Sequence, residues 1–344
     1  MRKYLLAVLL LAAFAMVGLW VTRPNEPSLA SSGRRLIATP VKQWDNNGSP
    51  ARQAAFSQDG RLLATSNAAG DVTVRQTSDW RAIRKLNVPG GATSLVFALD
   101  GLRLLTAGYD GIVRSWQLSD GRLVRQYRGA QAALWTLDLR PDGLEMAAGG
   151  EDGIIRLWSI DTGTLRLLKG HERNVWATSY APDGKTLVSG SFDHSVRIWR
   201  DGRAKPQVLS GHSQAVVGID ISPDGRLLAT GGDDSMLRFW RVSDGKPLRL
   251  LDAGNHVYNL EFSRDGQWLA SAGRARGGPG TFWHQLTGLG GTARPAHIWR
   301  VSDGKAVAAL PDVDDVMYVT FSPDQRYLVT SGEDSVKLWR LEAR

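Results

Sequence analysis

The segment that decides the fold is "GHERNVWATSYAPDGKTLVSGSFDHSVRIW", Gly170–Trp199. Apolar and polar residues alternate on both sides of the Asp183-Gly184 turn, a pattern typical of two antiparallel strands joined by a hairpin. A third short run ends at Trp199, and a second turn leads to "PQVLSGH", Pro206–His212. The segment therefore predicts a unit of four short antiparallel strands.

The same unit recurs along the chain. Successive Asp-Gly turns are 41, 42, 41, 41 and 41 residues apart, and they begin at Asp59, Asp100, Asp142, Asp183, Asp224 and Asp265. The next counterpart, Asp324-Gln325, follows at a spacing of one period plus an insertion. Tryptophan closes the third strand of six units, at Trp116, Trp158, Trp199, Trp240, Trp299 and Trp339. A fixed period of this length indicates repeated supersecondary units.

This repeat resembles the WD-repeat β-propeller family, with its period of about 40 residues, its Gly-His before the first strand and its Trp at the end of the third. The resemblance covers residues 34–344 in seven units. It implies an all-β fold, a seven-bladed β-propeller of four-stranded antiparallel blades. The seventh unit ends directly after its third strand, and Arg34–Trp44 precedes the first unit like an orphan fourth strand. We expect these two strands to pair and close the ring, which removes an open sheet edge.

An unbroken apolar run, residues 4–21, follows a basic start. Eighteen residues of helix span roughly 27 Å, close to the hydrocarbon thickness of a bilayer. We therefore expect one N-terminal hydrophobic helix, with residues 1–22 acting as a signal anchor or a signal peptide and residues 23–33 as a flexible linker. The positive-inside rule then predicts a single-pass protein of the inner (cytoplasmic) membrane, of bacterial type, with the propeller in the periplasm or outside. Cleavage of the segment would instead give a secreted protein.

Composition excludes several kinds of site. The chain has no cysteine, so neither a disulfide framework nor a thiolate metal site can form. Its six histidines are scattered over different units, and we expect neither a metal nor a cofactor. The net charge of +8 comes from Lys and Arg residues spread along the whole chain without a run of five, which argues against nucleic-acid binding.

The resemblance also gives a role to the polar residues of the opening segment. In this family a His, a Ser or Thr, an Asp and a Trp of one blade form a hydrogen-bonded chain. The fourth unit supplies His171, Ser189, Asp193 and Trp199, and the fifth supplies His212, Thr230, Asp234 and Trp240. The first unit has Arg75 where the Trp is expected, so this blade is degenerate.

A catalytic triad is the competing interpretation of Ser189, Asp193 and a histidine. Such a triad needs an exposed nucleophile on a strained turn, whereas Ser189 lies within a predicted strand and has no Gly-x-Ser-x-Gly motif around it. Thr230 at the equivalent position of the fifth unit indicates a repeated structural role. We therefore predict that the chain is not an enzyme.

The remaining candidate site is one face of the propeller. At the positions that this family usually uses for contacts, the chain has several aromatic residues beside an arginine. This composition is typical of interface anchors. The blade-six insertion, residues 274–295, contributes a further aromatic residue. The predicted partner-binding residues are Arg52, Tyr109, Trp135, Trp176, Phe192, Tyr258 and Trp283. They predict a monomeric, non-catalytic scaffold for an unidentified protein or peptide; a small-ligand sensor or a propeller enzyme at the channel mouth is the alternative.

Overall fold

The computed structural model describes residues 36–46, 48–201, 205–274, 296–310, 315–333 and 335–343. The chain divides into two compact units, Met1–Gly33 and Arg34–Arg344, and every described residue belongs to the second. The predicted anchor and linker, residues 1–33, therefore lie outside the described residues, as does most of the blade-six insertion. Over the described ranges, the structure contains no helix with the length and apolar character needed to span a bilayer.

The second unit is an all-β propeller of seven four-stranded antiparallel sheets. The first blade consists of β2 (Ala51–Phe56), β3 (Leu62–Asn67), β4 (Asp71–Gln76) and β5 (Ala82–Asn87). The second consists of β6 (Ser94–Phe97), β7 (Arg103–Ala107), β8 (Val113–Gln117) and β9 (Leu123–Tyr127). The third consists of β10 (Asp138–Leu139), β11 (Glu145–Gly149), β12 (Ile155–Ser159) and β13 (Leu165–Leu168).

The remaining blades repeat this order. The fourth consists of β14 (Val175–Tyr180), β15 (Thr186–Ser191), β16 (Val196–Arg200) and β17 (Gln207–Leu209). The fifth consists of β18 (Val216–Ile221), β19 (Leu227–Gly232), β20 (Met236–Arg241) and β21 (Pro247–Asp252). The sixth consists of β22 (His256–Phe262), β23 (Trp268–Arg274), β24 (His297–Arg300) and β25 (Ala306–Ala309). The seventh consists of β26 (Val316–Phe321), β27 (Tyr327–Gly332), β28 (Ser335–Ala343) and β1 (Leu36–Asp45).

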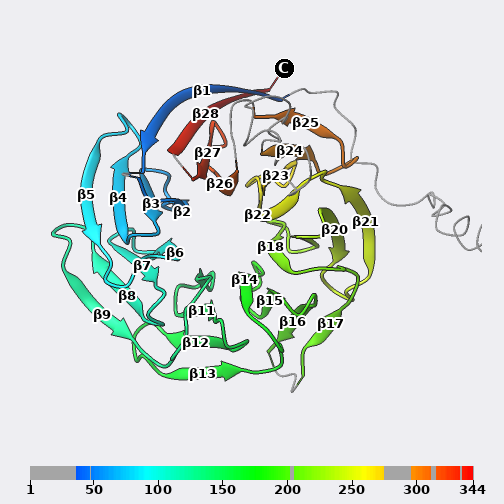
Figure 1. The fold of residues 1–344 in the computed structure, drawn as a ribbon, viewed down its shortest axis with the longest axis horizontal. Helices are drawn as coiled ribbons and strands as arrows, with labels where there is room; N and C mark the ends of the chain where they lie inside the picture. Colours follow the sequence, from blue (N-terminus) through cyan, green and yellow to red (C-terminus); the bar gives the residue numbers. More distant parts are fainter. Residues whose placement is uncertain are drawn as a thin grey trace, which may run out of the picture. The chain divides into compact units, whose positions relative to one another are not determined.

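The blades are arranged around a central axis (Figure 1). The first strand of each blade faces the centre, and the fourth forms the outer rim, so β2, β14 and β22 are inner strands and β5, β13 and β21 are outer ones. The inner strands carry the residues that surround the channel. The hairpins predicted from the Asp-Gly turns are therefore present, with the predicted number of strands in each blade.

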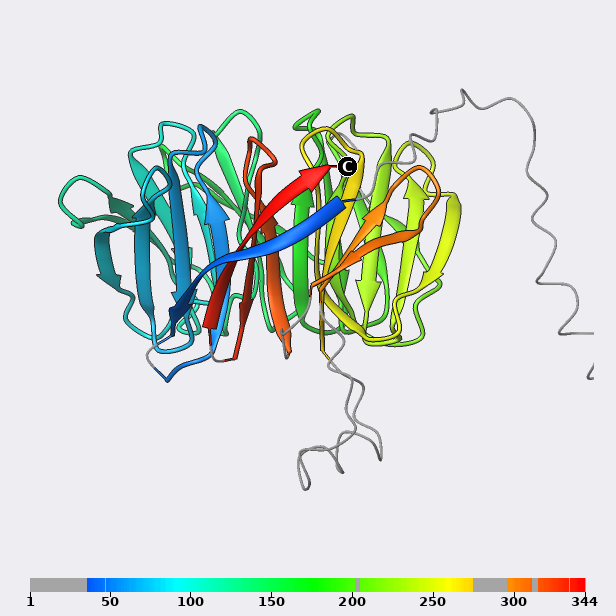
Figure 2. The ribbon, with the colours of Figure 1, turned by 90° about the horizontal axis from the view of Figure 1, so that it is seen from above.

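The seventh blade combines the two ends of this unit. β1 runs antiparallel to β28 along nearly its whole length, from Leu36 opposite Ala343 to Asp45 opposite Ser335, and Figure 2 shows the two strands side by side. The fourth strand of this blade thus comes from the residues before the first blade.

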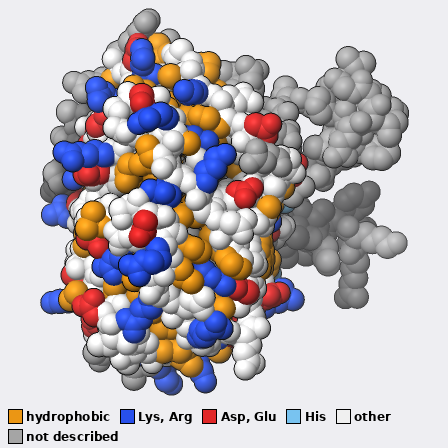
Figure 3. Space-filling model, turned by 90° about the vertical axis from the view of Figure 1, so that its left-hand side faces the viewer, with side chains coloured by type: hydrophobic (Ala, Val, Ile, Leu, Met, Phe, Trp, Pro, Cys, Tyr) orange, Lys and Arg blue, Asp and Glu red, His pale blue; other side chains and the backbone are white. Residues whose placement is uncertain are grey.

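The core lies between neighbouring blades, because each sheet presents its apolar side chains to the next sheet. Val196 and Ile198 of blade four, for example, share one buried cluster with Val216, Ile219 and Leu228 of blade five. Burying this surface stabilises the fold by about 25 cal/mol for each Å² of apolar area removed from water. On the side that Figure 3 shows, Lys and Arg side chains are scattered among acidic and apolar ones.

Candidate functional site: the central channel

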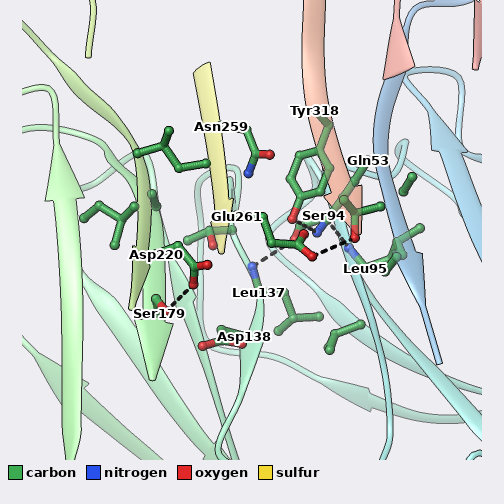
Figure 4. Close-up of a pocket in the computed structure, with 18 of the residues that line it drawn as sticks. Gln53, Ser94, Leu95, Leu137, Asp138, Ser179, Asp220, Asn259, Glu261 and Tyr318 are labelled. Carbon is green, nitrogen blue, oxygen red and sulfur yellow. Dashed lines mark hydrogen bonds between the residues drawn. The ribbon is translucent and has the colours of Figure 1, made fainter. Parts of the chain in front are cut away.

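The central channel contains a cavity of about 520 Å³. The inner strands of all seven blades line it, with residues that include Gln53, Ser94, Asp138, Ser179 and Asp220 (Figure 4). Because side chains alternate along a strand, every second residue of an inner strand reaches the channel, and irregularities in register at the start of five inner strands bring one further residue, such as Arg52, to the mouth. Equivalent residues of the seven blades therefore form layers, with one layer at the mouth and others deeper inside.

The mouth layer contains a ladder of aromatic rings. Tyr109 meets the Trp135 ring edge-on at 5.6 Å between centroids, and Trp135 stacks on Trp176 at 4.6 Å. Trp176 in turn stacks on Phe192 at 5.4 Å, and the Arg52 guanidinium lies 5.7 Å from the centroid of the Tyr109 ring. Four of the predicted partner-binding aromatics are thus in contact and half-buried, instead of standing freely in solvent. Aromatic contacts of this kind contribute about 0.5–1.5 kcal/mol each beyond the buried area.

The ladder buries polar atoms that have no partner. Tyr109 Oη, Trp135 Nε1 and Arg52 Nε are shielded from solvent, and none of them has a hydrogen-bond partner among the described residues. An unpaired buried donor costs about 1–3 kcal/mol. Three such atoms in one layer mark the mouth as the part of the channel with unused hydrogen-bonding capacity.

The other predicted residues of the mouth have different positions. Tyr258 lines the same cavity from β22, at a half-buried position. Trp283 lies outside the described residues, together with residues 275–295 of the insertion. Arg274 is the last residue of β23, so the insertion begins directly at the end of a blade-six strand.

The next layer of the channel joins neighbouring blades through hydrogen bonds. Gln53 Oε1 accepts the Leu95 N–H at 2.6 Å, and Ser94 Oγ accepts the Leu137 N–H at 3.0 Å. Asn259 Oδ1 accepts the Val319 N–H at 3.0 Å in the same way. Each of these side chains satisfies a backbone donor of the following blade that would otherwise be unpaired.

A deeper layer holds three half-buried carboxyl groups, carried by β10, β18 and β22 (Figure 4). Asp138 Oδ2 accepts the Tyr180 N–H at 2.6 Å, and Asp220 Oδ2 accepts the Phe262 N–H at 2.6 Å. Glu261 Oε1 accepts the Phe321 N–H at 3.0 Å, again from the next blade.

Burial changes the titration of these acids. It raises the pKa of Asp138 to about 6 and that of Asp220 to about 7, because the surrounding protein reduces the solvation of the charged form. Burial also raises the pKa of Glu261 to about 8, with a further contribution from the nearby Asp220 charge. The channel interior therefore changes its charge across the physiological pH range.

The predicted four-residue chain of blade four is hydrogen-bonded in the structure. Trp199 Nε1 donates to Ser189 Oγ at 2.9 Å, and Ser189 Oγ lies 2.7 Å from His171 Nε2. His171 Nδ1 lies 2.7 Å from Asp193 Oδ2. Burial opposes ionisation of Asp193, but the hydrogen bonds from His171 and Ser195 outweigh it and hold the pKa of Asp193 below its usual range.

Blade five repeats this arrangement. Trp240 Nε1 donates to Thr230 Oγ1 at 2.9 Å, His212 Nε2 lies 2.8 Å from that oxygen, and His212 Nδ1 lies 3.0 Å from Asp234 Oδ1. Burial lowers the pKa of His212. Ser189 and Thr230 are both fully buried, so neither hydroxyl is accessible to a substrate in this structure.

Blade one has Arg75 in place of the tryptophan, as its sequence indicates, and makes a different contact there. Arg75 Nη1 donates to Thr65 Oγ1 at 3.0 Å, and the guanidinium packs 4.6 Å from the centre of the Trp44 ring. The arginine therefore supplies the hydrogen bond to the hydroxyl that tryptophan supplies in blade four. The aromatic ring of this contact comes from β1.

The acids of the channel interior are functional candidates that the sequence interpretation missed. Glu261 follows Asp220 by one period of the repeat, and Asp138 precedes Asp220 by two periods. This periodicity was a usable signal, since all three interrupt an apolar inner strand at the same position. Across the described parts of the chain, no group of three His, Cys, Asp or Glu side chains is placed to hold a metal ion.

Comparison with known families gives a match to the model "WD domain, G-beta repeat" over residues 80–117, 121–159, 163–200, 204–241, 245–276 and 305–340. Each match covers the outer strand of one blade and inner strands of the next, and residues 1–79, with Arg75 of blade one, are unmatched. A search of curated proteins gave no match. The matches cover more than half of the chain, and the chain therefore belongs to the WD40 repeat family.

Proposed function

We propose that this propeller is a non-catalytic scaffold that binds a protein or peptide through the mouth of its central channel. WD40 propellers typically act as protein-interaction scaffolds. The observation that carries the proposal is the set of unpartnered donors on the aromatic ladder, Arg52 Nε, Tyr109 Oη and Trp135 Nε1. A partner would cover the half-buried rings, and its carbonyl or carboxylate oxygens would reach these shielded donors once the mouth side chains shift to admit them.

Affinity capture with the full-length chain tests this proposal. The bait variant Trp135→Ala/Trp176→Ala/Tyr258→Ala should lose proteins that the wild-type chain captures. The matched control, Val124→Ala/Val208→Ala/Leu250→Ala, changes exposed residues of three outer strands and should retain them. Equal capture by the mouth variant and the wild-type chain would exclude the mouth as the binding surface.

A second candidate function is recognition of a small ligand. The cavity of about 520 Å³ is within the range of roughly 300–1,000 Å³ that is usual for ligand sites. A thermal-shift screen of small molecules distinguishes the two functions. A ligand that stabilises the wild-type chain but not the variant Trp135→Ala/Trp176→Ala/Tyr258→Ala would favour the sensor.

We also propose that residues 4–21 anchor the chain in the inner membrane and that the propeller lies on its outer side. The apolar run, the basic residues before it and the linker after it support this topology. A reporter enzyme that is active only in the periplasm, fused after Arg344, should be active in intact cells. An inactive periplasmic reporter combined with an active cytoplasmic one would contradict the topology.

We further propose that β1 closes the ring and that the fold depends on this closure. The pairing along β28 and the packing of Trp44 against Arg75 support this role. A chain that lacks residues 34–45 should be aggregated or unfolded by gel filtration and circular dichroism, because β28 would become an open edge. A monomeric and stable deletion variant would contradict it.

A further inference from the structure

A row of arginines on the outer strands joins neighbouring blades. Arg84, Arg125, Arg166 and Arg249 recur near the period of the repeat. They share one register position. Each lies opposite the residue directly before the third-strand tryptophan, whose place Arg75 takes in blade one. Equivalent positions on equivalent strands should make equivalent contacts, so any exception needs a physical cause.

Three of these arginines bind the next blade. Arg84 Nε donates to the Leu118 carbonyl at 3.1 Å, and Arg125 Nη2 donates to the Thr162 carbonyl at 2.7 Å. Arg249 Nη1 donates to the Val301 carbonyl at 2.6 Å. In each case the accepting carbonyl belongs to the turn region after the third strand of the next blade. These contacts hold the rim of one blade against its neighbour.

Arg166, at the boundary between blades three and four, makes a different contact. Its Nη2 lies 3.4 Å from Glu145 Oε2 of its own blade, and its side chain is 55% exposed. Glu145 Oε1 also accepts the Tyr180 hydroxyl at 2.9 Å, which fixes the carboxylate at this boundary. The described contact of Arg166 thus lies within its own blade.

A groove of about 180 Å³ lies at this boundary between blades three and four. Leu157, Leu187 and Trp199 contribute apolar surface to it, and Leu167 at its edge is 41% exposed. Trp199 is half-buried, in contrast to the five other tryptophans that close a third strand, which are all buried: Trp116, Trp158, Trp240, Trp299 and Trp339. Its indole N–H remains bonded to Ser189, so the ring is fixed in position.

The charge around the groove is predominantly positive. Its lining includes the exposed side chains of Arg166, Lys169, Lys185 and Lys205, against the carboxylates Glu145 and Asp201. Glu145 is already engaged by Tyr180 and Arg166. An apolar floor surrounded by exposed lysines is complementary to a segment that carries both apolar and acidic side chains.

We propose that the groove between blades three and four is a second docking site, which binds an acidic segment of a partner protein. A large apolar side chain of this segment would lie on Trp199 and Leu167, and neighbouring carboxylates would meet Lys169 and Lys185. The groove is lined by strand residues of both blades and by turns, and it shares no lining residue with the channel cavity. The two sites could therefore be occupied together, which would allow the propeller to bridge two proteins.

Selection from a displayed library of short random peptides tests the proposal with the full-length chain. Peptides are retained if they bind the wild-type chain but not the variant Lys169→Glu/Lys185→Glu. The retained peptides should be rich in Asp and Glu and contain Leu, Phe or Trp. Failure to enrich such peptides would overturn the proposal.

Titration of one retained peptide separates docking in the groove from general charge attraction. Lys169→Glu/Lys185→Glu should weaken binding at least tenfold, and Leu167→Ala about threefold or more. The control Lys85→Glu/Lys246→Glu, which reverses two exposed lysines elsewhere, should change binding less than twofold. Equal loss with both lysine pairs, or no loss with Leu167→Ala, would overturn the site.

The mouth variant Trp135→Ala/Trp176→Ala/Tyr258→Ala completes the test. It should bind the peptide like the wild-type chain even if it loses the partners of the channel. Loss of peptide binding in this variant would overturn the groove as an independent site.

Discussion

Arg52 and Gln53 are neighbours on β2 but belong to different layers of the channel. The polar side-chain atoms are hydrogen-bonded in the layer of Gln53, whereas several in the layer of Arg52 are unpaired among the described residues. Gln53 uses both ends of its amide to contact other blades, since it accepts the Leu95 N–H and donates to Tyr318 Oη at 2.8 Å. Arg52 Nε is buried without a partner among the described residues, like Tyr109 Oη and Trp135 Nε1 in the same layer.

This contrast separates structural from binding residues. Interior side chains such as Gln53 and Asn259 cross from blade to blade and satisfy backbone donors, so they hold the ring together. The mouth residues retain hydrogen-bonding capacity that the described part of the fold does not use. Removing an interior side chain should therefore reduce stability, whereas changing a mouth residue should mainly affect binding.

The largest expected effect concerns the interior acids. Their pKa values of about 6, 7 and 8 in the folded chain lie above those of an unfolded chain, so their protonated forms favour folding. This stability is fully present below about pH 4 and is lost as pH rises through the folded-state values, at up to about 1.4 kcal/mol per pH unit for each group. Denaturant unfolding should show Asp138→Asn/Asp220→Asn/Glu261→Gln more stable than wild type at pH 8, with the gap closing towards pH 5.

The control for this experiment changes three exposed carboxylates of the surface, as Glu151→Gln/Asp161→Asn/Glu172→Gln. It removes the same number of charges without touching the channel and should not reproduce the gain at pH 8. If the free energies of unfolding of the triple channel variant and the wild type remain parallel from pH 5 to pH 8, the acids do not titrate as proposed.

The second expected effect uses the neighbouring pair directly. Gln53→Leu should destabilise the fold by about 2–4 kcal/mol, because it leaves the buried Leu95 N–H and the Tyr318 hydroxyl without their partner. Arg52→Leu should change the free energy of unfolding by less than about 1 kcal/mol, since Nε has no partner among the described residues and the guanidinium loses only a contact with the Tyr109 ring at 5.7 Å. Urea unfolding monitored by circular dichroism measures both. If both variants lose the same free energy of unfolding, the two layers do not differ in their contribution to stability.

Much of the ring could be predicted from the sequence because its signals are local. The hairpin around Asp183-Gly184 and the strand that ends at Trp199 are each specified within a few residues, and repetition makes the pattern unambiguous. The residues of the blade-four chain, His171, Ser189 and Asp193, could be placed because their positions within the repeat are fixed. Such features need no knowledge of which blade is next to which.

Contacts between blades were much harder to predict. Trp44 packs on Arg75 although the two residues are distant in the sequence and lie in different blades, and the hydroxyl of Tyr180 in blade four donates to Glu145 in blade three. The channel acids accept hydrogen bonds from backbone N–H groups of the next blade, as Asp138 does from the Tyr180 N–H. A repeat pattern fixes each blade, but these contacts depend on the side chains that two particular blades bring together.

The smallest expected effect compares two tryptophans that differ in their hydrogen bonds. Trp135→Phe keeps an aromatic ring in the ladder and loses no hydrogen bond to the described residues, so it should cost less than about 1 kcal/mol of stability. Trp199→Phe should cost about 1–2 kcal/mol more, because Ser189 loses the donated indole N–H. Urea midpoints give this difference.

Partner binding provides the second measurement, since a hydrogen bond of about 1 kcal/mol from Trp135 Nε1 to the partner predicts roughly fivefold weaker binding for Trp135→Phe. Unchanged binding with a large loss of stability would instead assign Trp135 to the structural layer.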